Sequence, residues 1–192
     1  EGGITSPQGF HAGATYAGIK QKIKGGLDLG GLFSEGQCAA AGLFTTNRIK
    51  AAPVVLDQER LYDGKAVAVV VNSGCANACT GEQGLADAVE MTELAAKSIG
   101  VSSDDVLVAS TGVIGRHLPM ECIRTGMAHI VLSRDGGHKL AKAIMTTDTV
   151  PKEVAVASRV GDSEFVIGGV AKGSGMIHPD LATLLCFLTT DA

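Results

Sequence analysis

The sequence lacks the features by which a chain of this size engages membranes or nucleic acids. No apolar run approaches the ~18 residues that a membrane-spanning helix needs, and no basic block is present. Lysine and arginine number 16 against 20 aspartates and glutamates, a formal net charge of −4. Nucleic acid and anionic membrane surfaces are therefore not expected as partners. No signal peptide is visible at Glu1, where the start methionine is missing, so we expect that the extreme N-terminus is absent or trimmed.

Regularly spaced cysteines and clustered histidines are lacking, which argues against two kinds of site. The five cysteines are an odd number without regular spacing, so we expect free thiols in a reducing cytoplasm. Cys75 and Cys79 are the closest pair, but no second pair or nearby histidine completes a zinc site, and no bound metal is expected. None of the five histidines lies with a serine and an acidic residue in the order of a Ser-His-Asp triad.

Glycine is abundant where aromatic residues are few. Of 192 residues, 26 are glycine, and only 4% are aromatic. Small residues allow backbones to approach closely and loops to adopt positive φ. This composition suits a site built from main-chain groups, and it suits a tightly packed layered fold equally well. The length is enough for one large domain or two small ones with a substantial core.

One buried strand leads into a polar loop and a helix. Residues 66–71 are a continuous apolar run, typical of a strand buried on both faces. The loop at 72–81 follows it, a common position for a site, although its asparagines would serve equally well to satisfy backbone groups. Thr80 and Gln83 have capping-box spacing for the start of the helix, and Gly100 ends the helical pattern.

The remaining elements also alternate between strands and helices, so we expect an α/β protein. Residues 154–160 and 164–172 predict a hairpin closed by Gly161 and Asp162. A buried strand is expected at 106–109, and helices at 119–132 and 139–145. The N-terminal part predicts an irregular segment at 3–18, an exposed strand at 19–24, and short strands at 27–29 and 39–45 separated by a turn at 34–36.

The last 23 residues contain an abrupt change of pattern at Thr183. A glycine-rich stretch and a turn signal at 178–180 precede an apolar run of strand length from Thr183 to Leu188. The Thr183 hydroxyl could attack the carbonyl carbon of Ala182 and cut the chain. The freed α-amino group, with an ordinary pKa of about 7.7–8.0, would then be a general base for the same hydroxyl. A threonine that opens such a run is also an ordinary strand residue.

A Thr-Gly pair and a lysine elsewhere in the chain could assist such a nucleophile. A strand that ends in Thr111 and Gly112 can direct a hydroxyl and a backbone N–H at one point, as a developing oxyanion requires, although turns commonly contain such pairs. Lys172 ends the second strand of the expected hairpin, which would carry its charge toward Thr183. The alternative for Lys172 is a residue that caps an exposed strand and points to water.

Strings spread over the whole chain resemble one family. KGSGMIHPDLATLL, with FLTTDA behind it, resembles the cleavage and nucleophile motif of the ornithine acetyltransferases. GF.A.G...GIK, LFTTN and AAPV are similar to the N-terminal region of that family, and NSG.ANACTG and MTTDT resemble two further motifs. Asparagine is more usual in the family where this chain has Cys75, which argues against a polar role at that position.

The resemblance implies the N-terminal, alpha part of a bifunctional glutamate N-acetyltransferase. Its fold would be the ornithine acetyltransferase/DmpA-like fold, an α/β arrangement of layered mixed β-sheets with flanking helices. Members cut themselves before the threonine of an Ala-Thr pair, here Ala182 and Thr183. Residues 1–182 would then be the alpha-subunit region, one α/β domain, and 183–192 the start of the beta-subunit region. The C-terminal beta chain of the same precursor would be the partner, in a heterotetramer of two alpha and two beta chains.

By the same resemblance, the protein would move the acetyl group of N-acetylornithine to glutamate in arginine biosynthesis. Thr183 would be the nucleophile, and Thr111 and Gly112 the oxyanion pair. Thr146, Lys172 and Thr183 would bind substrate. Some members also accept acetyl-CoA as a substrate, and no metal or prosthetic group is implied. Without the resemblance, Thr146 would be an exposed polar residue at a helix end.

Two alternatives belong to other functional classes. A related N-terminal-nucleophile aminopeptidase or amidohydrolase would use water in place of glutamate, but its family usually has serine where this chain has Thr183. A non-catalytic ligand-binding homologue would keep the fold without turnover. Acetyl transfer measured with and without glutamate distinguishes the three.

Overall fold

The computed structural model describes residues 2–20, 26–173 and 184–192 and has a layered α/β fold with two β-sheets, as the sequence predicts. The large sheet has four strands in spatial order: β1 (Phe10–Thr15), β2 (Leu29–Ala39), β3 (Lys65–Cys75) and β4 (Val106–Val113). β1, β2 and β3 pair antiparallel, whereas β3 and β4 pair parallel. No helix within the described ranges is long and apolar enough to cross a membrane.

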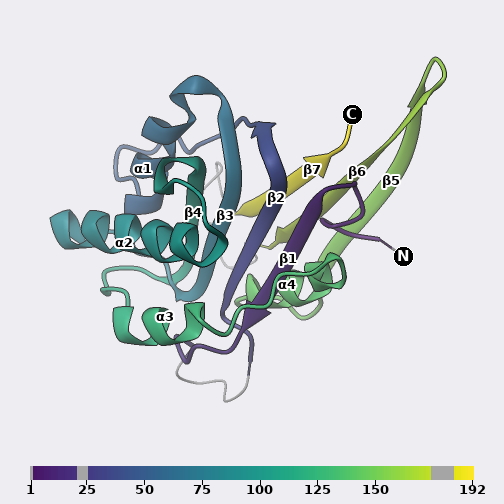
Figure 1. The fold of residues 1–192 in the computed structure, drawn as a ribbon. Helices are drawn as coiled ribbons and strands as arrows, with labels where there is room; N and C mark the ends of the chain where they lie inside the picture. The colour runs from purple at the N-terminus through teal and green to yellow at the C-terminus, as the bar shows by residue number, and fades with distance from the viewer. Residues whose placement is uncertain (1, 21–25, 174–183) are drawn as a thin grey trace.

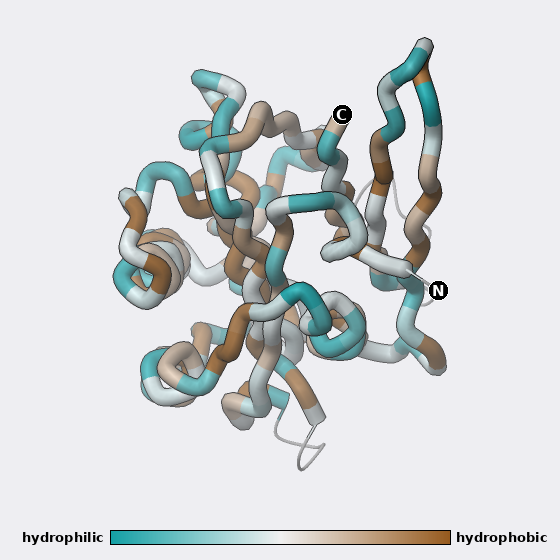
Figure 2. Tube along the Cα trace, turned by 45° about the vertical axis from the view of Figure 1, so that its right-hand side comes forward, coloured by the Kyte–Doolittle hydropathy of each residue, from teal (hydrophilic) through white to brown (hydrophobic). Residues whose placement is uncertain are grey.

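The small sheet has three antiparallel strands: β5 (Lys152–Val160), β6 (Ser163–Lys172) and β7 (Leu185–Thr190). The β5–β6 hairpin is confirmed, and Gly161, with a φ of 60°, lies in its turn. The hairpin projects beyond the body of the molecule (Figures 1 and 2). β7 pairs with β6 and forms one edge of the small sheet.

Helices cover both faces of the large sheet (Figure 1). Three lie on one face: α1 (Ala52–Arg60), α2 (Gly81–Ile99) and α3 (Met120–Met127). α4 (Gly137–Ala143) lies on the other face, together with the small sheet. Short 3-10 turns, η1 (Leu61–Asp63), η2 (Ser103–Asp105) and η3 (Arg134–Gly136), complete the connections.

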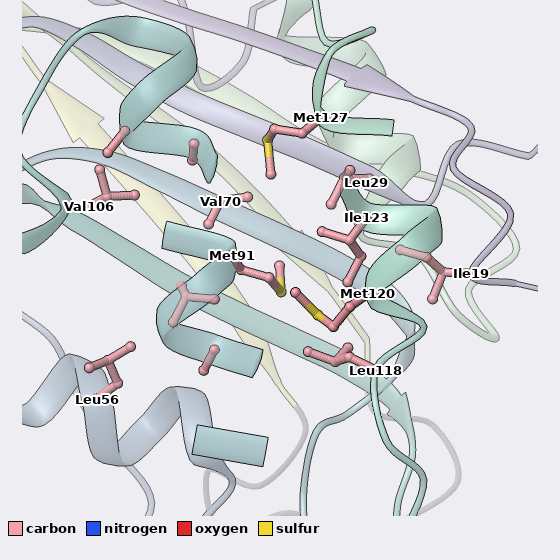
Figure 3. Close-up of a cluster of buried hydrophobic side chains, with 14 of the residues drawn as sticks. Ile19, Leu29, Leu56, Val70, Met91, Val106, Leu118, Met120, Ile123 and Met127 are labelled. Carbon is pink, nitrogen blue, oxygen red and sulfur yellow. The ribbon is translucent and has the colours of Figure 1, made fainter. Parts of the chain in front are cut away.

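Successive side chains of β3 point to opposite faces of the large sheet, and both faces are covered. Three helices cover one face, and α4 with the small sheet covers the other. Ala68 and Val70 point into the cluster under α1, α2 and α3, where Met91 and Ile123 are fully buried (Figure 3). Val71 points the other way, into a second cluster that α4 and the small sheet complete. A strand buried on both faces needs apolar residues at every position, which its sequence supplies.

The second cluster joins the two sheets into one core. It contains Val71 of β3 and Ala109 of β4 from the large sheet, and Val170 of β6 from the small sheet. Ile144, directly after α4, is fully buried in the same cluster, and Leu185 of β7 packs against it. The carboxyl ends of β3, β4 and β6 are therefore held beside one another.

The N-terminal elements differ from the prediction. The segment expected to be irregular contains β1, and one strand, β2, replaces the two strands expected at 27–29 and 39–45. The residues 34–36, expected to turn, lie within β2, where the pairing with β3 shifts register between Phe33 and Cys38. An irregularity in one strand accommodates polar residues without reversing the chain. Ile19 is buried rather than part of an exposed strand, and residues 21–25 lie outside the description.

The helices follow the prediction with smaller differences. α2 begins and ends where expected, with Gly100 at a φ of 77° as its C-cap. The expected capping box is wrong, because the Thr80 hydroxyl donates to the Asn77 side chain at 2.8 Å and Gln83 bonds to Asp87. α3 ends at Met127 instead of continuing to residue 132. α1 has no counterpart among the sequence-based elements.

Candidate functional site

Three buried polar side chains lie where the strands leave the second cluster. Side chains of a strand alternate between faces, so a residue two positions on continues the same face. Two positions after the cluster members Val71, Ala109 and Val170 come Ser73, Thr111 and Lys172. These three are 0%, 2% and 4% exposed. Polar groups at such depth need partners or a function, so this end of the two sheets is the candidate site.

The Thr111–Gly112 pair lies at the end of β4, against β3. Ser73 pairs with Thr111, and Gly74 with Gly112, in the parallel register. Gly112 has a φ of 135°, and a Cβ there would overlap the backbone of Gly74 and Cys75, so only glycine fits. Within the described part of the chain, the Thr111 hydroxyl makes no hydrogen bond. The Thr111 hydroxyl is therefore available as a hydrogen-bond donor. It lies beside Gly112, whose backbone conformation only glycine can adopt there.

The end of α4 is tied to the same place by its last carbonyl group. The Ser73 hydroxyl donates to the Ala143 carbonyl oxygen. The Lys20 ammonium donates to that oxygen at 3.3 Å and to the Leu27 carbonyl oxygen at 2.9 Å. Two donors from different segments therefore position the residues that follow Ala143, including Thr146.

Asp148 connects this segment with the end of β6. Its carboxylate accepts hydrogen bonds from the Lys152 ammonium at 2.6 Å, the Gly173 N–H at 2.6 Å and the Thr146 N–H at 3.2 Å. Burial by itself would raise the pKa of Asp148, but these three donors outweigh it and lower the pKa to about 2. Asp148 is therefore a carboxylate at all ordinary pH values, and it holds Thr146 near Gly173.

Lys172 and Lys20 both interact electrostatically with Asp148, and Lys172 lowers the pKa of Lys20. Burial lowers the pKa of Lys172, which Asp148 partly offsets and Lys152 reinforces. Burial also lowers the pKa of Lys20; Asp28 and Asp148 oppose this shift and Lys172 adds to it. The alternative in which Lys172 points to water is therefore wrong, because its side chain is buried in the inter-sheet core.

The structure places the described residues that the sequence singles out in two groups. Thr111 and Gly112 meet the β3 end, and Asp148 joins Thr146 to Gly173, which follows Lys172. Ala182 and Thr183 lie outside the described residues. Leu185, two positions after Thr183 in the chain, pairs with Lys172 across β6 and β7.

Ser73, Lys20 and Asp148 were missed from the sequence. Ser73 lies in the loop whose position after a buried strand is typical of a site, and Asp148 lies in the MTTDT string. Their roles depend on contacts with residues far along the chain, which local patterns do not contain. The loop asparagines satisfy neighbouring groups: the Asn72 amide donates to the Cys75 carbonyl at 2.9 Å, and the Asn77 amide donates to the Gly84 carbonyl at 2.7 Å.

Comparison with known proteins gives one consistent match. The model of the ArgJ family matches residues 11–192. The chain is 54% identical over 192 residues to the arginine biosynthesis bifunctional protein ArgJ of Dehalococcoides mccartyi, and 53% identical over 193 residues to that of Symbiobacterium thermophilum. Each alignment covers 100% of this chain but 47% and 48% of the relative, so the chain spans about half the length of the curated relatives it matches.

Two solved structures share the fold. The crystal structure of arginine biosynthesis bifunctional protein ArgJ from Bacillus halodurans superposes with a TM-score of 0.88 at 41% identity, and the match covers 94% of this chain and 95% of that one. Ornithine acetyltransferase from Mycobacterium tuberculosis, solved in complex with ornithine, superposes with a TM-score of 0.87 at 44% identity, covering 94% of this chain and 96% of that one.

Proposed function

The chain belongs to the ArgJ family, and on that premise we propose that it is the N-terminal part of an ornithine acetyltransferase that carries an acetyl group on Thr183. The observation that supports the proposal is the buried cluster shared by Val71, Ala109 and Val170, because Thr111 and Lys172 each follow a cluster member by two positions on its strand. Leu185, two residues after Thr183, pairs with Lys172 there. The ornithine bound to the Mycobacterium tuberculosis relative supports an ornithine derivative as substrate.

The first half-reaction moves the acetyl group to the protein. The Thr183 oxygen attacks the acetyl carbonyl carbon of N-acetylornithine, and the hydroxyl proton passes to the α-amine of Thr183. The negative oxygen that develops accepts hydrogen bonds from the Thr111 hydroxyl and the Gly112 N–H. The C–N bond then breaks, and the α-ammonium returns its proton to the departing ornithine amine. The product is an acetyl ester on Thr183.

The second half-reaction uses the same groups in reverse. The amine of glutamate attacks the ester carbonyl carbon, and the oxyanion again lies at Thr111 and Gly112. The C–O bond breaks, the Thr183 oxygen regains a proton, and N-acetylglutamate leaves. Lys172 supplies positive charge that disfavours protonation of the Thr183 amine and attracts a substrate carboxylate. Thr146, held by Asp148, is proposed as a further substrate contact.

Formation of the free amine requires a cut before Thr183. The Thr183 hydroxyl attacks the Ala182 carbonyl carbon, the peptide C–N bond breaks, and an ester replaces it. Water hydrolyses this ester, which leaves a carboxylate on Ala182 and a free α-amine on Thr183. The partner is then the C-terminal chain of the same precursor, in an assembly of two alpha and two beta chains. We propose a cytoplasmic enzyme without a metal or prosthetic group, for which acetyl-CoA is a further candidate donor.

An acetyl-transfer assay on the full-length protein tests the reaction class. N-acetylornithine is supplied with and without glutamate, and ornithine and N-acetylglutamate are both measured. Glutamate-dependent release of ornithine in equal amount to N-acetylglutamate is expected. Release of ornithine with acetate, at a rate independent of glutamate, would instead make the protein a hydrolase. Absence of turnover by correctly folded protein would reject both activities.

Self-cleavage is tested by Thr183→Ala in the full-length protein. We expect an uncut, inactive precursor, because the substitution removes the hydroxyl that both the cut and the transfer need. Intact mass measured over time follows the cut, with Thr190→Ala, a change at an exposed hydroxyl of β7, as the matched control. Cleavage of the Thr183→Ala protein between residues 182 and 183 would show that another residue or a protease makes the cut.

A further inference from the structure

Asp148 is a buried carboxylate that takes part in no step of the proposed reaction. Its side chain is 2% exposed, although the residue lies in the loop between α4 and β5. One oxygen, Oδ1, accepts hydrogen bonds from the Gly173 N–H and the Lys152 ammonium, each at 2.6 Å. The other oxygen, Oδ2, accepts from the Thr146 N–H at 3.2 Å. Both oxygens are therefore engaged within the protein, and the side chain has almost no surface for a substrate to touch.

The two backbone donors of Asp148 adjoin the residues that are proposed to bind substrate. One donor is the N–H of Thr146 itself. The other is the N–H of Gly173, which directly follows Lys172 at the end of β6. The contact between Asp148 and Gly173 spans 25 positions of the chain, so it is a tertiary contact and not part of a local turn. One carboxylate therefore holds two separate backbone segments beside each other.

The close approach of Asp148 is possible because position 173 is glycine. A Cβ at Gly173 would lie 2.9 Å from the Asp148 Oδ1 atom, which is too close for an unstrained contact. The next described atoms belong to the Lys152 side chain, at an ordinary van der Waals distance of 3.8 Å. The φ of Gly173 lies outside the left-handed region, so the backbone itself would accept alanine. A side chain at this position would thus displace the carboxylate specifically.

We propose that Asp148 is a positioning residue that holds Thr146 and the peptide after Lys172 as one substrate-binding unit, with Gly173 providing the space. This rests on the proposed function, in which Thr146 and Lys172 contact the substrate. Both carboxylate oxygens are needed, because asparagine has one acceptor atom and would turn its NH₂ group toward one of the two backbone N–H groups. A buried N–H that loses its acceptor costs more than the hydrogen bond itself contributes.

A role through charge alone makes the opposite prediction for one ligand. Ornithine carries a net positive charge at neutral pH, and glutamate carries a net negative one. If Asp148 acted only by its charge, its removal would weaken ornithine binding and strengthen glutamate binding. Displacement of the binding groups weakens both ligands, because both occupy the same site in the two half-reactions. The direction of the change for glutamate therefore distinguishes position from charge.

Calorimetric titration of the full-length protein with ornithine and with glutamate tests the proposal without turnover, because neither ligand carries an acetyl group. Asp148→Asn is expected to raise the dissociation constants of both ligands by about tenfold. Gly173→Ala retains the charge but displaces the carboxylate, so it is expected to raise both constants as well. Because the two changes break the same contact, the double variant should bind at most about twofold more weakly than the weaker single variant.

Asp191→Asn is the matched control. The Asp191 carboxylate accepts the Gln8 N–H at 2.8 Å and the Val166 N–H at 2.7 Å, so it also joins two backbone segments. It directly follows β7, at the end of that strand opposite to the end that pairs with Lys172. Its substitution is expected to leave both dissociation constants unchanged, and urea unfolding measures what each of the two substitutions costs in stability alone.

The two dissociation constants decide the proposal. Weaker binding of both ligands by Asp148→Asn and Gly173→Ala, with normal binding by Asp191→Asn, supports it. Opposite shifts for the two ligands in Asp148→Asn would overturn it in favour of a charge effect. Unchanged constants in folded variants would overturn it in favour of a purely structural contact.

Gly173→Ala decides by the same two constants if Asp148→Asn does not fold. Native protein that binds both ligands but transfers no acetyl group would reject the proposed function, and the constants of the variants would still decide the role of Asp148. Native protein that binds neither ligand would overturn both.

Discussion

At the scale of single residues, the candidate site contains polar groups whose burial costs free energy. Taking an ammonium group out of water costs free energy that its partners must offset. Lys172 occupies such a position directly beyond Val170, and its pKa is lowered by burial. A buried cation whose pKa is shifted by burial and by neighbouring charges is typical of a functional site.

Thr111 can be tested as an oxyanion donor. Thr111→Ala is expected to lower kcat for acetyl transfer by on the order of 100-fold with a smaller change in KM, since the donor matters most once charge develops. Ser110→Ala is the control: its hydroxyl donates to Asn72 at 2.6 Å on the other side of β4. Normal turnover with only a raised KM would place Thr111 in substrate binding.

Lys172 can be tested through the pH profile. In the proposed mechanism, an ammonium near the Thr183 amine would lower the pKa of that amine, so removing the ammonium would raise this pKa and leave less free base at neutral pH. Lys172→Met is therefore expected to move the rising limb of kcat/KM upward by on the order of one pH unit and to raise KM for N-acetylornithine. Lys97→Met, at the exposed end of α2, is the control. Superimposable profiles with an equal KM would remove Lys172 from the site.

The sequence identified the residues whose role is local and missed those whose role is not. Thr111 and Gly112 lie just before the end of β4, and Lys172 ends β6. The hydrophobic pattern indicates such strand ends, and the family resemblance singled out the Thr-Gly pair. Ser73 and Lys20 meet at the Ala143 carbonyl, which lies 70 and 123 positions away from them. Such a meeting depends on how α4 packs, and no spacing rule contains it.

At the scale of elements, α1 covers the edge of the large sheet at β4, where a fifth strand could otherwise pair. β4 is an edge strand, so its outward backbone groups need partners other than a ladder. Asp57 accepts a hydrogen bond from the Val108 N–H at 2.9 Å, and Arg60 donates to the Val106 carbonyl oxygen at 2.5 Å. Both groups come from one turn of α1. The helix therefore uses charged side chains to satisfy the edge.

Asp57 makes this arrangement sensitive to pH. Burial raises its pKa from 3.8 to about 7, although the Val108 N–H and Arg60 oppose the shift. Between these two values the folded state retains a proton that the unfolded state has released, so stability decreases as pH rises from 4 to 7. Asp57→Asn is expected to flatten this decrease, because the amide oxygen still accepts from Val108 and carries no charge.

Urea unfolding at pH 4.5, 6 and 7.5 measures the effect. The stability of Asp57→Asn relative to the native protein should increase across this series and then become constant. Asp162→Asn, in the exposed β5–β6 turn, is the matched control and should show no such trend. An equal pH dependence for the native protein and Asp57→Asn would mean that Asp57 is ionised without cost.

Elements with strong periodicity were predictable, and those fixed by tertiary pairing were not. β3, α2 and the β5–β6 hairpin follow directly from apolar runs, a terminal glycine and a turn. β1 is rich in glycine and alanine, and it becomes a strand because β2 lies beside it. The register shift in β2 likewise depends on β3, so the polar residues there gave a false turn signal.

At the scale of the whole molecule, the two sheets depend on one shared core. Val170→Ala removes two methyl groups from the cluster that joins β6 to β3 and β4, and we expect a loss of about 2 kcal/mol in the free energy of unfolding. Urea unfolding measures the loss, and Val131→Ala, at an exposed residue, should cost less than about 0.5 kcal/mol. Equal losses for the two variants would show that the sheets are held together elsewhere.

The covered edges of the large sheet have a consequence for how the protein avoids misassembly. α1 blocks strand addition along β4, and Ala12 of β1 exchanges backbone hydrogen bonds of 3.0 and 2.9 Å with Ser133 at the opposite edge. Fibril growth and domain swapping both begin with an unpaired edge onto which another chain can dock. Both edges of the large sheet are protected at these points, so aggregation during synthesis is expected to begin at the small sheet.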